Sequence, residues 1–266
     1  MKRQKKSITL SIIIVTYNSQ EYIQGCLNSI YKTLPASNRS EIIILDNNSK
    51  DSTLEILKPF FFKIILIKND KNYGFAKTCN QGIKIARGKY IFFINPDAEV
   101  KKNAIENLST FLQQNPEVGV VGPLILKPDG TTDPWQMGYE KTLWRAFLEE
   151  IVEKIVYVFK PRWFLKLAAL IDLNYTDHYQ IREVDWVSGT ALMVRKKVLE
   201  KVGRFDERFF LYYEELDLQK RIKRLGWNIY HLPTSVVVHY GKGSTLNVDN
   251  SYHNLKIYRQ HSFFWP

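Results

Sequence analysis

Three carboxylates lie within four residues of one another in the segment Glu214-Glu215-Leu216-Asp217, directly after the apolar run 209–213. Partial burial beside like charges raises the pKa of a carboxylate, which suits a general base. Acidic side chains are also common in the first turn of a helix, where they interact favourably with its dipole. The helix explains one or two of the acids but not their position after an apolar run, so a general base remains the second interpretation.

Two further segments place polar side chains directly after buried strands. Asn95-Pro96-Asp97 follows the apolar run 90–94. It suits either a turn in which Asp97 caps the helix that starts near Lys101, or a metal or diphosphate site with Asp97 as an oxygen ligand. Asp46-Asn47 follows the run 42–45 and suits either a turn or a carboxylate that accepts hydrogen bonds from a base or ribose. Each segment taken alone favours the turn.

His239 ends an apolar run at residues 236–238. A single histidine at a strand end is usually structural, and it becomes a plausible metal ligand only if Asp97 lies close to it. The two cysteines, Cys26 and Cys79, form no metal-type pair, and they favour a reducing compartment.

Familiar phosphate-binding motifs are absent. The sequence contains no G-x-G-x-x-G, and its nearest approach to a P-loop, residues 82–89, is one residue too long and is followed by Tyr90. This argues against a dinucleotide-dependent dehydrogenase and against a P-loop kinase or ATPase.

Strands and helices alternate in the first half, which predicts an α/β fold with a mostly parallel central sheet flanked by helices. Strands are expected at 8–15, 42–45, 63–67 and 90–94, with helices from Asn18-Ser19 to residue 33, after residue 52, at 75–86 and at 101–114. Ligands of such sheets bind beyond the carboxyl ends of the strands. We therefore expect the site where the polar strand ends gather.

The second half differs in pattern but is not separated by a linker. A strand at 184–194, interrupted at Ser188-Gly189, precedes helices at 197–202 and 216–225 and strands at 227–232 and 235–240. Residues 144–173 are amphipathic and suit either a helical cover for the sheet or binding at a membrane interface. We expect one domain over residues 1–266, with an aromatic and basic tail at 246–266.

Charge favours an anionic partner. The balance is 38 − 27 = +11, and the pI is about 9.4. No uninterrupted apolar stretch reaches roughly 18 residues, so we expect a cytoplasmic protein, with peripheral contact on the inner face of an anionic membrane as an alternative. Charge alone suggests a nucleic-acid-binding module, and no helix-turn-helix, RNP or zinc pattern supports one, so no nucleic-acid partner is expected.

Considered together, these segments resemble the inverting GT-A glycosyltransferases of family 2, and most of all their rhamnosyltransferase-like bacterial branch. The resemblance covers residues 8–126 and 182–245. It is carried by residues 11–18, 46–49, 72–76, 80–82, 92–97, 184–194, 203–218 and 237–244.

The resemblance implies a GT-A fold and an enzyme of polysaccharide biosynthesis at the bacterial cell envelope. Such an enzyme moves a sugar, with a deoxyhexose such as rhamnose as the candidate, from a nucleotide-diphosphate donor to a hydroxyl of a glycan or lipid-linked glycan. It implies a divalent metal, Mg²⁺ or Mn²⁺. Residues 8–126 would bind the nucleotide sugar, 182–245 the acceptor, and the variable helical insert 129–180 would carry acceptor specificity.

The resemblance also assigns roles to individual residues. Asp97 and His239 would hold the metal, Glu215 would be the base with Glu214 beside it, and Trp186, Ser188 and Gly189 would face the acceptor. The nucleotide sugar would lie against Thr16, Tyr17, Asn18, Asp46, Asn47, Asn72, Gly74, Phe75, Asn80, Asn95 and Asp97.

Two positions depart from the family pattern. Asn95 replaces the first acid of the D-x-D metal motif, and Glu214-Glu215 replaces the usual Glu-Asp pair. A nucleotidyltransferase is the alternative enzyme class, but it would need a Gly-rich basic loop where Thr16-Tyr17-Asn18 stands. Adjacent glutamates cannot flank a glycosidic bond as the two carboxylates of a glycosidase do.

Overall fold

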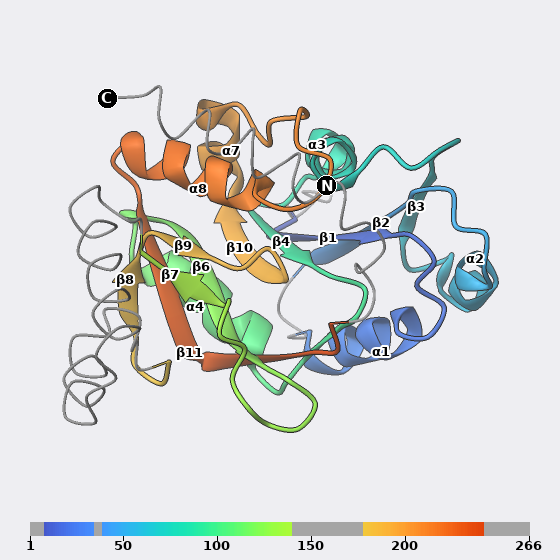
Figure 1. The fold of residues 1–266 in the computed structure, drawn as a ribbon, viewed down its shortest axis with the longest axis horizontal. Coiled ribbons are helices and arrows are strands. Elements are labelled where there is room, and N and C mark those ends of the chain that lie inside the picture. The colour runs from blue at the N-terminus through green and yellow to red at the C-terminus, as the bar shows by residue number, and fades with distance from the viewer. Residues whose placement is uncertain (1–7, 35–38, 140–177, 242–266) are drawn as a thin grey trace, which may run out of the picture.

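The computed structural model describes residues 8–34, 39–139 and 178–241, and its centre is a nine-stranded sheet (Figure 1). The main path of the sheet has the order β3-β2-β1-β4-β10-β6-β11-β5, and β8 pairs with β11. Its strands are β1 (Leu10–Thr16), β2 (Ser40–Asp46), β3 (Ile65–Lys68), β4 (Tyr90–Ile94), β5 (Ala98–Val100), β6 (Val118–Leu126), β8 (Arg182–Val184), β10 (Ala191–Arg195) and β11 (Asn228–His239). A separate pair joins β7 (Met137–Gly138) to β9 (Trp186–Val187).

Six of these nine strands run in one direction. β3, β2, β1 and β4 are mutually parallel, β10 runs against β4 and β6, and β11 is parallel to β6. β5 and β8 run against β11. The carboxyl ends of six strands and the amino end of β10 therefore lie along the same edge of the sheet.

Helices cover both faces of the sheet. In Figure 1, α3 (Phe75–Ile85), α7 (Lys196–Val202) and α8 (Glu214–Arg224) lie above it, and α1 (Ile23–Thr33) and α4 (Ala104–Gln114) lie below. The short α2 (Thr53–Leu57) and the 3₁₀ turn η1 (Lys58–Phe60) connect β2 to β3.

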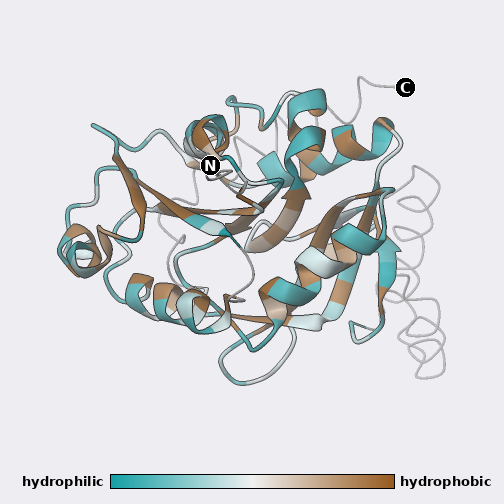
Figure 2. Cartoon of the chain, turned by 180° about the vertical axis from the view of Figure 1, so that it is seen from behind, coloured by the Kyte–Doolittle hydropathy of each residue, from teal (hydrophilic) through white to brown (hydrophobic). Residues whose placement is uncertain are grey.

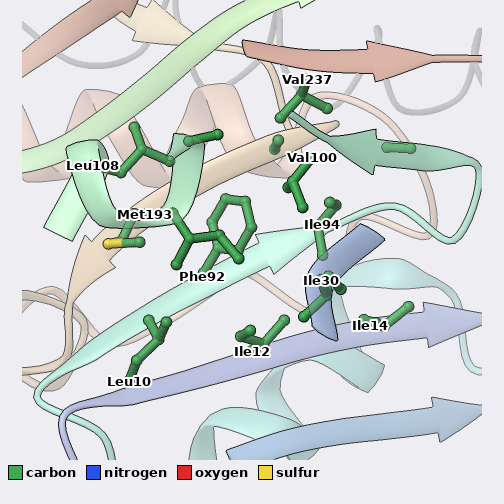
Figure 3. Packing of buried hydrophobic residues seen from close by; sticks show 14 of the residues in the cluster. Leu10, Ile12, Ile14, Ile30, Phe92, Ile94, Val100, Leu108, Met193 and Val237 are labelled. Carbon is green, nitrogen blue, oxygen red and sulfur yellow. The ribbon is translucent and has the colours of Figure 1, made fainter. Parts of the chain in front are cut away.

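The two faces carry two apolar clusters because successive side chains of a strand point to opposite sides. Leu10, Ile12 and Ile14 of β1 pack with α1 and α4, as Figure 3 shows, whereas Ile13 packs with α3, α7 and α8. Figure 2 shows the central strands coloured as apolar and the helices divided into an apolar and a polar side. The strands are buried on both faces, which explains their nearly continuous aliphatic sequences.

The predicted fold class is confirmed, but several element boundaries are wrong. Helix α1 begins at Ile23 with no side-chain cap, because Asn18 and Ser19 hydrogen-bond to the loop after β2 instead. The nine-residue β6 was not predicted. β11 is one strand with a register shift between Leu232 and Val236, where two strands were expected.

The capping interpretation of Asp97 is also wrong. β5 follows Asp97 directly, and α4 begins only at Ala104, with Asn103 at its N-cap and no side-chain cap. Most of the insert 129–180, including 144–173, and the whole tail 246–266 lie outside the described residues, so the boundaries drawn for them stay predictions. Within the described part, no helix has the length and apolar character needed to cross a membrane.

Candidate active site

The carboxyl ends of β1 and β2 are joined through Asp46. Its carboxylate accepts hydrogen bonds from the Thr16 hydroxyl (3.0 Å), the Ser49 hydroxyl (2.5 Å) and the Ser49 backbone N–H (2.9 Å). Asp46 is 1% exposed. The structure thus uses this carboxylate to fix the loop, and a contact between Asp46 and a nucleoside stays a prediction.

Asn47 is the centre of a second buried network. Its side-chain N–H₂ donates to Asn72 Oδ1 (3.1 Å) and to the Gly74 carbonyl (3.3 Å). Its Oδ1 accepts from the Thr78 hydroxyl (2.8 Å) and the Asn69 amide (2.9 Å). The side chain holds the loop before α3 against the end of β2.

The residues that remain open at this edge are Tyr17 and Asn18. Tyr17 is 40% exposed, and Asn18 adopts a left-handed backbone (φ 50°), which asparagine tolerates better than most residues. The Asn18 carbonyl oxygen of the side chain accepts the Lys50 N–H at 2.8 Å. These two residues form the exposed part of the predicted nucleoside site.

The start of α3 is in contact with the second half of the chain at Gly74. Gly74 has φ +80°, and a Cβ there would lie 2.4 Å from the Phe210 carbonyl oxygen. The Phe75 N–H donates to that same carbonyl (2.7 Å). Only glycine fits this close approach.

Asn80, which was predicted to line the donor site, hydrogen-bonds to the second half of the chain. Its Nδ2 donates to the Phe205 carbonyl (2.9 Å) and to Glu207 (3.1 Å), and its Oδ1 accepts the Phe205 N–H (3.1 Å). The residue is 4% exposed. Its amide holds the loop 205–213 in place, and a contact of Asn80 with the donor stays a prediction.

Asp97 and His239 are brought together by the pairing of β5 with β11. His239 is the register partner of Ala98, and the Tyr240 N–H donates to the Asp97 carbonyl at 2.9 Å. Asp97 Oδ1 lies 3.4 Å from His239 Nε2, and Asp97 is 1% exposed. This proximity is the condition under which His239 becomes a plausible ligand.

A second carboxylate lies on the other side of the same imidazole. Asp133 Oδ2 is 3.9 Å from His239 Nδ1. Burial lowers the pKa of His239, but the Asp133 and Asp97 carboxylates outweigh it and raise that pKa to about 9. The position of the imidazole between the two carboxylates therefore favours the protonated, positively charged form of His239.

These residues fit a divalent cation. His239 Nε2 is buried without an aligned hydrogen-bond partner, and it lies near a carboxylate oxygen of Asp97. Two ligand atoms of one metal ion would be arranged in this way. Asp133 beside Nδ1 matches the carboxylate–histidine–metal arrangement in which the second ring nitrogen is oriented by an acid. No cluster of three or more ligand side chains occurs among the described residues, so the remaining positions would be left for water and diphosphate oxygens.

Glu214 and Glu215 occupy the first turn of α8, and the backbone of the two residues before them is strained. Tyr212 and Tyr213 both adopt left-handed backbone conformations, with φ 72° and 71°. Such conformations cost roughly 1–3 kcal/mol each for residues other than glycine and cluster at functional sites. The strain brings two glutamates to the start of a helix facing the site.

The two glutamates differ in their surroundings. Glu214 is 4% exposed, and burial together with the adjacent Glu215 charge raises its pKa well above 4.5. Glu215 is less enclosed, and burial raises its pKa while the Gly189 backbone N–H opposes the shift. Asp217 pairs with Arg221 (2.8 Å). Glu215 is thus the acid that combines a raised pKa with a partly exposed side chain, although its Oε2 is buried.

Of the three predicted acceptor residues, Gly189 lies directly against Glu215. A Cβ on Gly189 would lie 3.3 Å from Glu215 Cδ, so the carboxyl group packs directly on this glycine. Ser188 hydrogen-bonds to Thr190 (3.1 Å). The Trp186 indole packs on Gly138, where an added Cβ would lie 2.5 Å from the ring.

Buried glutamines that the sequence analysis did not single out hold this segment. Gln219 Oε1 accepts the Val187 N–H (2.8 Å), and its Nε2 donates to the Val187 carbonyl (2.8 Å) and the Glu215 carbonyl (3.0 Å). The Ser188 N–H donates to the Gln136 carbonyl (2.8 Å). Position i+4 from Glu215 in the α8 sequence is the only signal that pointed to Gln219.

Asp133 was missed for a different reason. It follows β6 in the sequence. That strand was not predicted, so no polar site residue was expected beyond its carboxyl end. The run 118–126 is apolar throughout but contains two glycines and a proline, which obscured it as a strand.

Comparison with known proteins identifies the family and the fold of the chain. Residues 11–218 match the family model of glycosyl transferase family 2. The N-acetylglucosaminyl-diphospho-decaprenol L-rhamnosyltransferase of Mycobacterium tuberculosis is 26% identical over 89% of this chain and 77% of its own length. The low-salt glycan biosynthesis hexosyltransferase Agl10 of Haloferax volcanii is 26% identical over 91% of this chain and 71% of its own.

Solved structures share the fold. The crystal structure of Staphylococcus aureus TarS 1–349 has a TM-score of 0.63 at 20% identity and covers 94% of this chain. GalNAc-T7, solved with UDP, GalNAc and Mn²⁺, has a TM-score of 0.65 at 15% identity and covers 96%. This chain spans 64% and 48% of those two structures. Because the family model matches most of its length, the chain belongs to glycosyl transferase family 2 and is a glycosyltransferase with a GT-A fold.

Proposed function

We propose that this enzyme transfers a sugar, with a deoxyhexose such as rhamnose as the first candidate, from a nucleotide-diphosphate donor to a hydroxyl of a glycan or lipid-linked glycan. The observation that carries the proposal is the juxtaposition of Asp97 and His239, 3.4 Å apart, at the edge where the strand ends gather. The relative from Mycobacterium tuberculosis is named as a rhamnosyltransferase acting on a diphospho-decaprenol, which supports this choice of sugar and acceptor.

The nucleoside lies against Tyr17 and Asn18, and the diphosphate lies beside Asp97 and His239. Asp97 and His239 would hold a divalent ion, which would supply positive charge next to the leaving diphosphate. Asp133 orients the imidazole of His239. Mn²⁺ is the first ion to test, since the similar fold of GalNAc-T7 was solved with Mn²⁺.

Glu215 removes the proton from the acceptor hydroxyl. The acceptor oxygen forms a bond to the anomeric carbon while the bond from that carbon to the diphosphate oxygen breaks, and the nucleotide diphosphate leaves with the electron pair. One displacement from the opposite side inverts the anomeric centre. Burial raises the pKa of Glu215 and makes it a stronger base for this step than an exposed carboxylate.

A thermal-shift screen tests the donor proposal. Nucleotide diphosphates and nucleotide sugars are added to the purified chain with and without Mn²⁺, and to Asp97→Ala. At about 100 times Kd a ligand stabilises by roughly 2.7 kcal/mol, which corresponds to about 5–10 °C in a protein of this size. We expect such a shift only for the wild-type chain with metal.

An equal shift without metal, or in Asp97→Ala, contradicts the assignment of Asp97. The sugar that gives the largest shift is then used as donor, and nuclear magnetic resonance of the product reads the anomeric configuration. A product that retains the configuration of the donor contradicts the single displacement.

A further inference from the structure

An exposed tryptophan lies on the loop that follows β6, beside residues of the candidate site. The Trp135 side chain is 76% exposed. Its backbone N–H donates to Asp133 Oδ1 (2.8 Å), and the other oxygen of that carboxylate faces His239 at 3.9 Å. The next residue, Gln136, accepts the Ser188 N–H. The backbone of Trp135 therefore lies between Asp133, which is near the predicted metal ligand His239, and Gln136, which bonds to the predicted acceptor residue Ser188.

The loop that carries Trp135 is fixed to the sheet. The Asp133 N–H donates to the Ile125 carbonyl (2.9 Å), and the Ile125 N–H donates to Gln136 Oε1 (2.8 Å). Gln136 Nε2 donates in turn to the Asp133 carbonyl (2.9 Å), and Gln136 is fully buried. In Figure 1 this loop projects below the sheet, next to the end of β11.

The indole of Trp135 takes no visible part in folding. Within the described residues it makes no hydrogen bond and stacks on no other ring. A large aromatic ring held in water on a fixed loop is a recognition feature, because ordering the loop costs nothing further when a ligand binds. The ring face carries partial negative charge and attracts the partly positive C–H groups of a pyranose.

We propose that Trp135 is the platform on which a pyranose ring of the acceptor glycan stacks. This inference rests on the proposed function. In the strand order, β2 and β1 lie toward one end of the sheet and β6 and β11 toward the other, with β4 and β10 between them. The loop of Trp135 reaches both predicted sides of the site, because Asp133 lies 3.9 Å from His239 and the Gln136 carbonyl accepts the Ser188 N–H. An acceptor bound near Ser188 would therefore lie close to this loop.

The direct test uses the full chain labelled with 5-fluorotryptophan, which gives fluorine resonances from six tryptophans. The Trp135→Phe variant identifies the Trp135 resonance by its absence. Methyl glycosides of glucose, N-acetylglucosamine and rhamnose are titrated to about 100 mM, because single-sugar contacts bind in the millimolar range. We expect at least one glycoside to shift the Trp135 resonance in a saturable way.

Trp227 is the internal control. Its ring lies under Lys197 Nζ at 4.9 Å and packs at Gly119, away from the site, so its resonance should not move. If no glycoside shifts the Trp135 resonance, or if all tryptophans shift together, the platform assignment is overturned. The titration is run with and without UDP and Mn²⁺, so that a failure of the proposed donor site does not hide the result.

Variants separate the acceptor from other ligands. Trp135→Ser should raise the apparent Kd of the active glycoside roughly tenfold, and Trp135→Phe should raise it less, because a smaller aromatic face remains. Binding of UDP with Mn²⁺ should not change. Loss of UDP binding in Trp135→Ser would place the residue on the donor instead. Loss of co-sedimentation with anionic vesicles, with the glycoside Kd unchanged, would replace the acceptor by a membrane surface.

Discussion

The loops after β1 and β2 and the region around α8 treat buried polar groups in opposite ways. At β1 and β2, Asp46 and Asn47 have a protein partner for each polar side-chain atom. Around α8, Glu214 Oε2, Glu215 Oε2 and His239 Nε2 are buried without a hydrogen-bond partner. Such groups are costly and rare in folded proteins and also occur at Tyr31 and Tyr90, so the chemistry proposed for these three residues depends on the predictions below.

The contrast separates two kinds of mutational effect. The loops after β1 and β2 form the satisfied region, in which the buried polar atoms of Asp46 and Asn47 are hydrogen-bonded. Removing a side chain there leaves its partners unpaired, so the free energy of unfolding should fall while turnover changes little. In the α8 region, removing a buried charge should abolish or slow turnover and leave stability unchanged or higher, the usual trade-off at active sites. The predictions below test this division.

Asp97→Asn should have the largest effect. The substitution keeps the shape and removes the charge that attracts a cation, so turnover should fall by at least about 10³-fold, as for loss of a major electrostatic contact. Metal-dependent binding of the nucleotide diphosphate found in the thermal-shift screen, measured by calorimetry, should be lost with an unchanged melting temperature. Glu106→Gln, on the exposed side of α4, is the control and should retain activity. Full metal-dependent binding by Asp97→Asn would exclude Asp97 as a ligand.

Glu215→Gln should come next. It keeps the shape and removes the basicity, so turnover should fall by roughly 10²–10⁴ while donor affinity hardly changes. Burial raises the pKa of Glu215, so the acidic limb of the wild-type pH–turnover profile should lie above 4.5. Activity rises with pH through that limb because only the deprotonated form accepts the proton. A limb at or below 4.5, or an unaffected variant, would mean that the base lies elsewhere.

Asn47→Ala should show the opposite behaviour. It leaves the hydrogen-bonding groups of Asn69, Asn72 and Thr78 without their partner, so the free energy of unfolding should fall by about 2–3 kcal/mol. At saturating donor, turnover of the folded variant should stay within about twofold of the wild-type value. Urea unfolding and steady-state kinetics check the two parts.

Asn107→Ala is the matched control, because the Asn107 side chain makes one hydrogen bond to the described residues, to the Thr234 carbonyl. It should lose only about 1 kcal/mol. A large loss of turnover in Asn47→Ala with little loss of stability would remove the distinction between the two regions.

The satisfied region was largely predictable, and the α8 region only in part. Polar residues after β1 and β2 are near their strands in sequence, so the edge on which they gather follows from parallel βαβ units. The contact of Asp97 with His239 depends on the pairing of β5 with β11, which no local pattern specifies. The strained backbone of Tyr212 and Tyr213 has no sequence signal at all, because tyrosine disfavours positive φ.

Gln219→Leu should have a smaller effect on turnover. Without the amide, the Val187 backbone loses two partners, and the neighbouring Ser188-Gly189 segment is no longer fixed against Glu215. Turnover should fall roughly tenfold, equivalent to about 1.4 kcal/mol, and the acidic limb should move because Gly189 N–H lowers the pKa of Glu215.

The control for this variant is Gln81→Leu. Gln81 hydrogen-bonds to Asn69 in the satisfied region, at 3.0 and 3.1 Å. Gln81→Leu should reduce stability without moving the pH profile. If both glutamine variants shift stability alone, Gln219 is a structural residue and does not position the base.

Glu214→Gln should have the smallest effect and the one most specific to the comparison. Burial and the charge of Glu215 raise the pKa of Glu214 above its ordinary value of 4.5. A carboxylate with a raised folded-state pKa binds its proton more tightly in the folded chain, so it destabilises the fold as pH rises from 4.5 through that pKa. Replacing it by a neutral amide should therefore stabilise the protein at pH 7–8.

The sign of the pH dependence makes this prediction strict. Below pH 4.5 the carboxyl group is protonated in the folded and the unfolded chain, so the gain from Glu214→Gln should vanish there. Denaturant unfolding across this range measures the gain, and turnover should fall less than in Glu215→Gln, because Glu214 is the more deeply buried of the two. If Glu214→Gln instead lowers stability at pH 7–8, the buried charge is compensated. The α8 region then stores no unfavourable electrostatic energy, and its difference from the loops after β1 and β2 reduces to hydrogen-bond geometry.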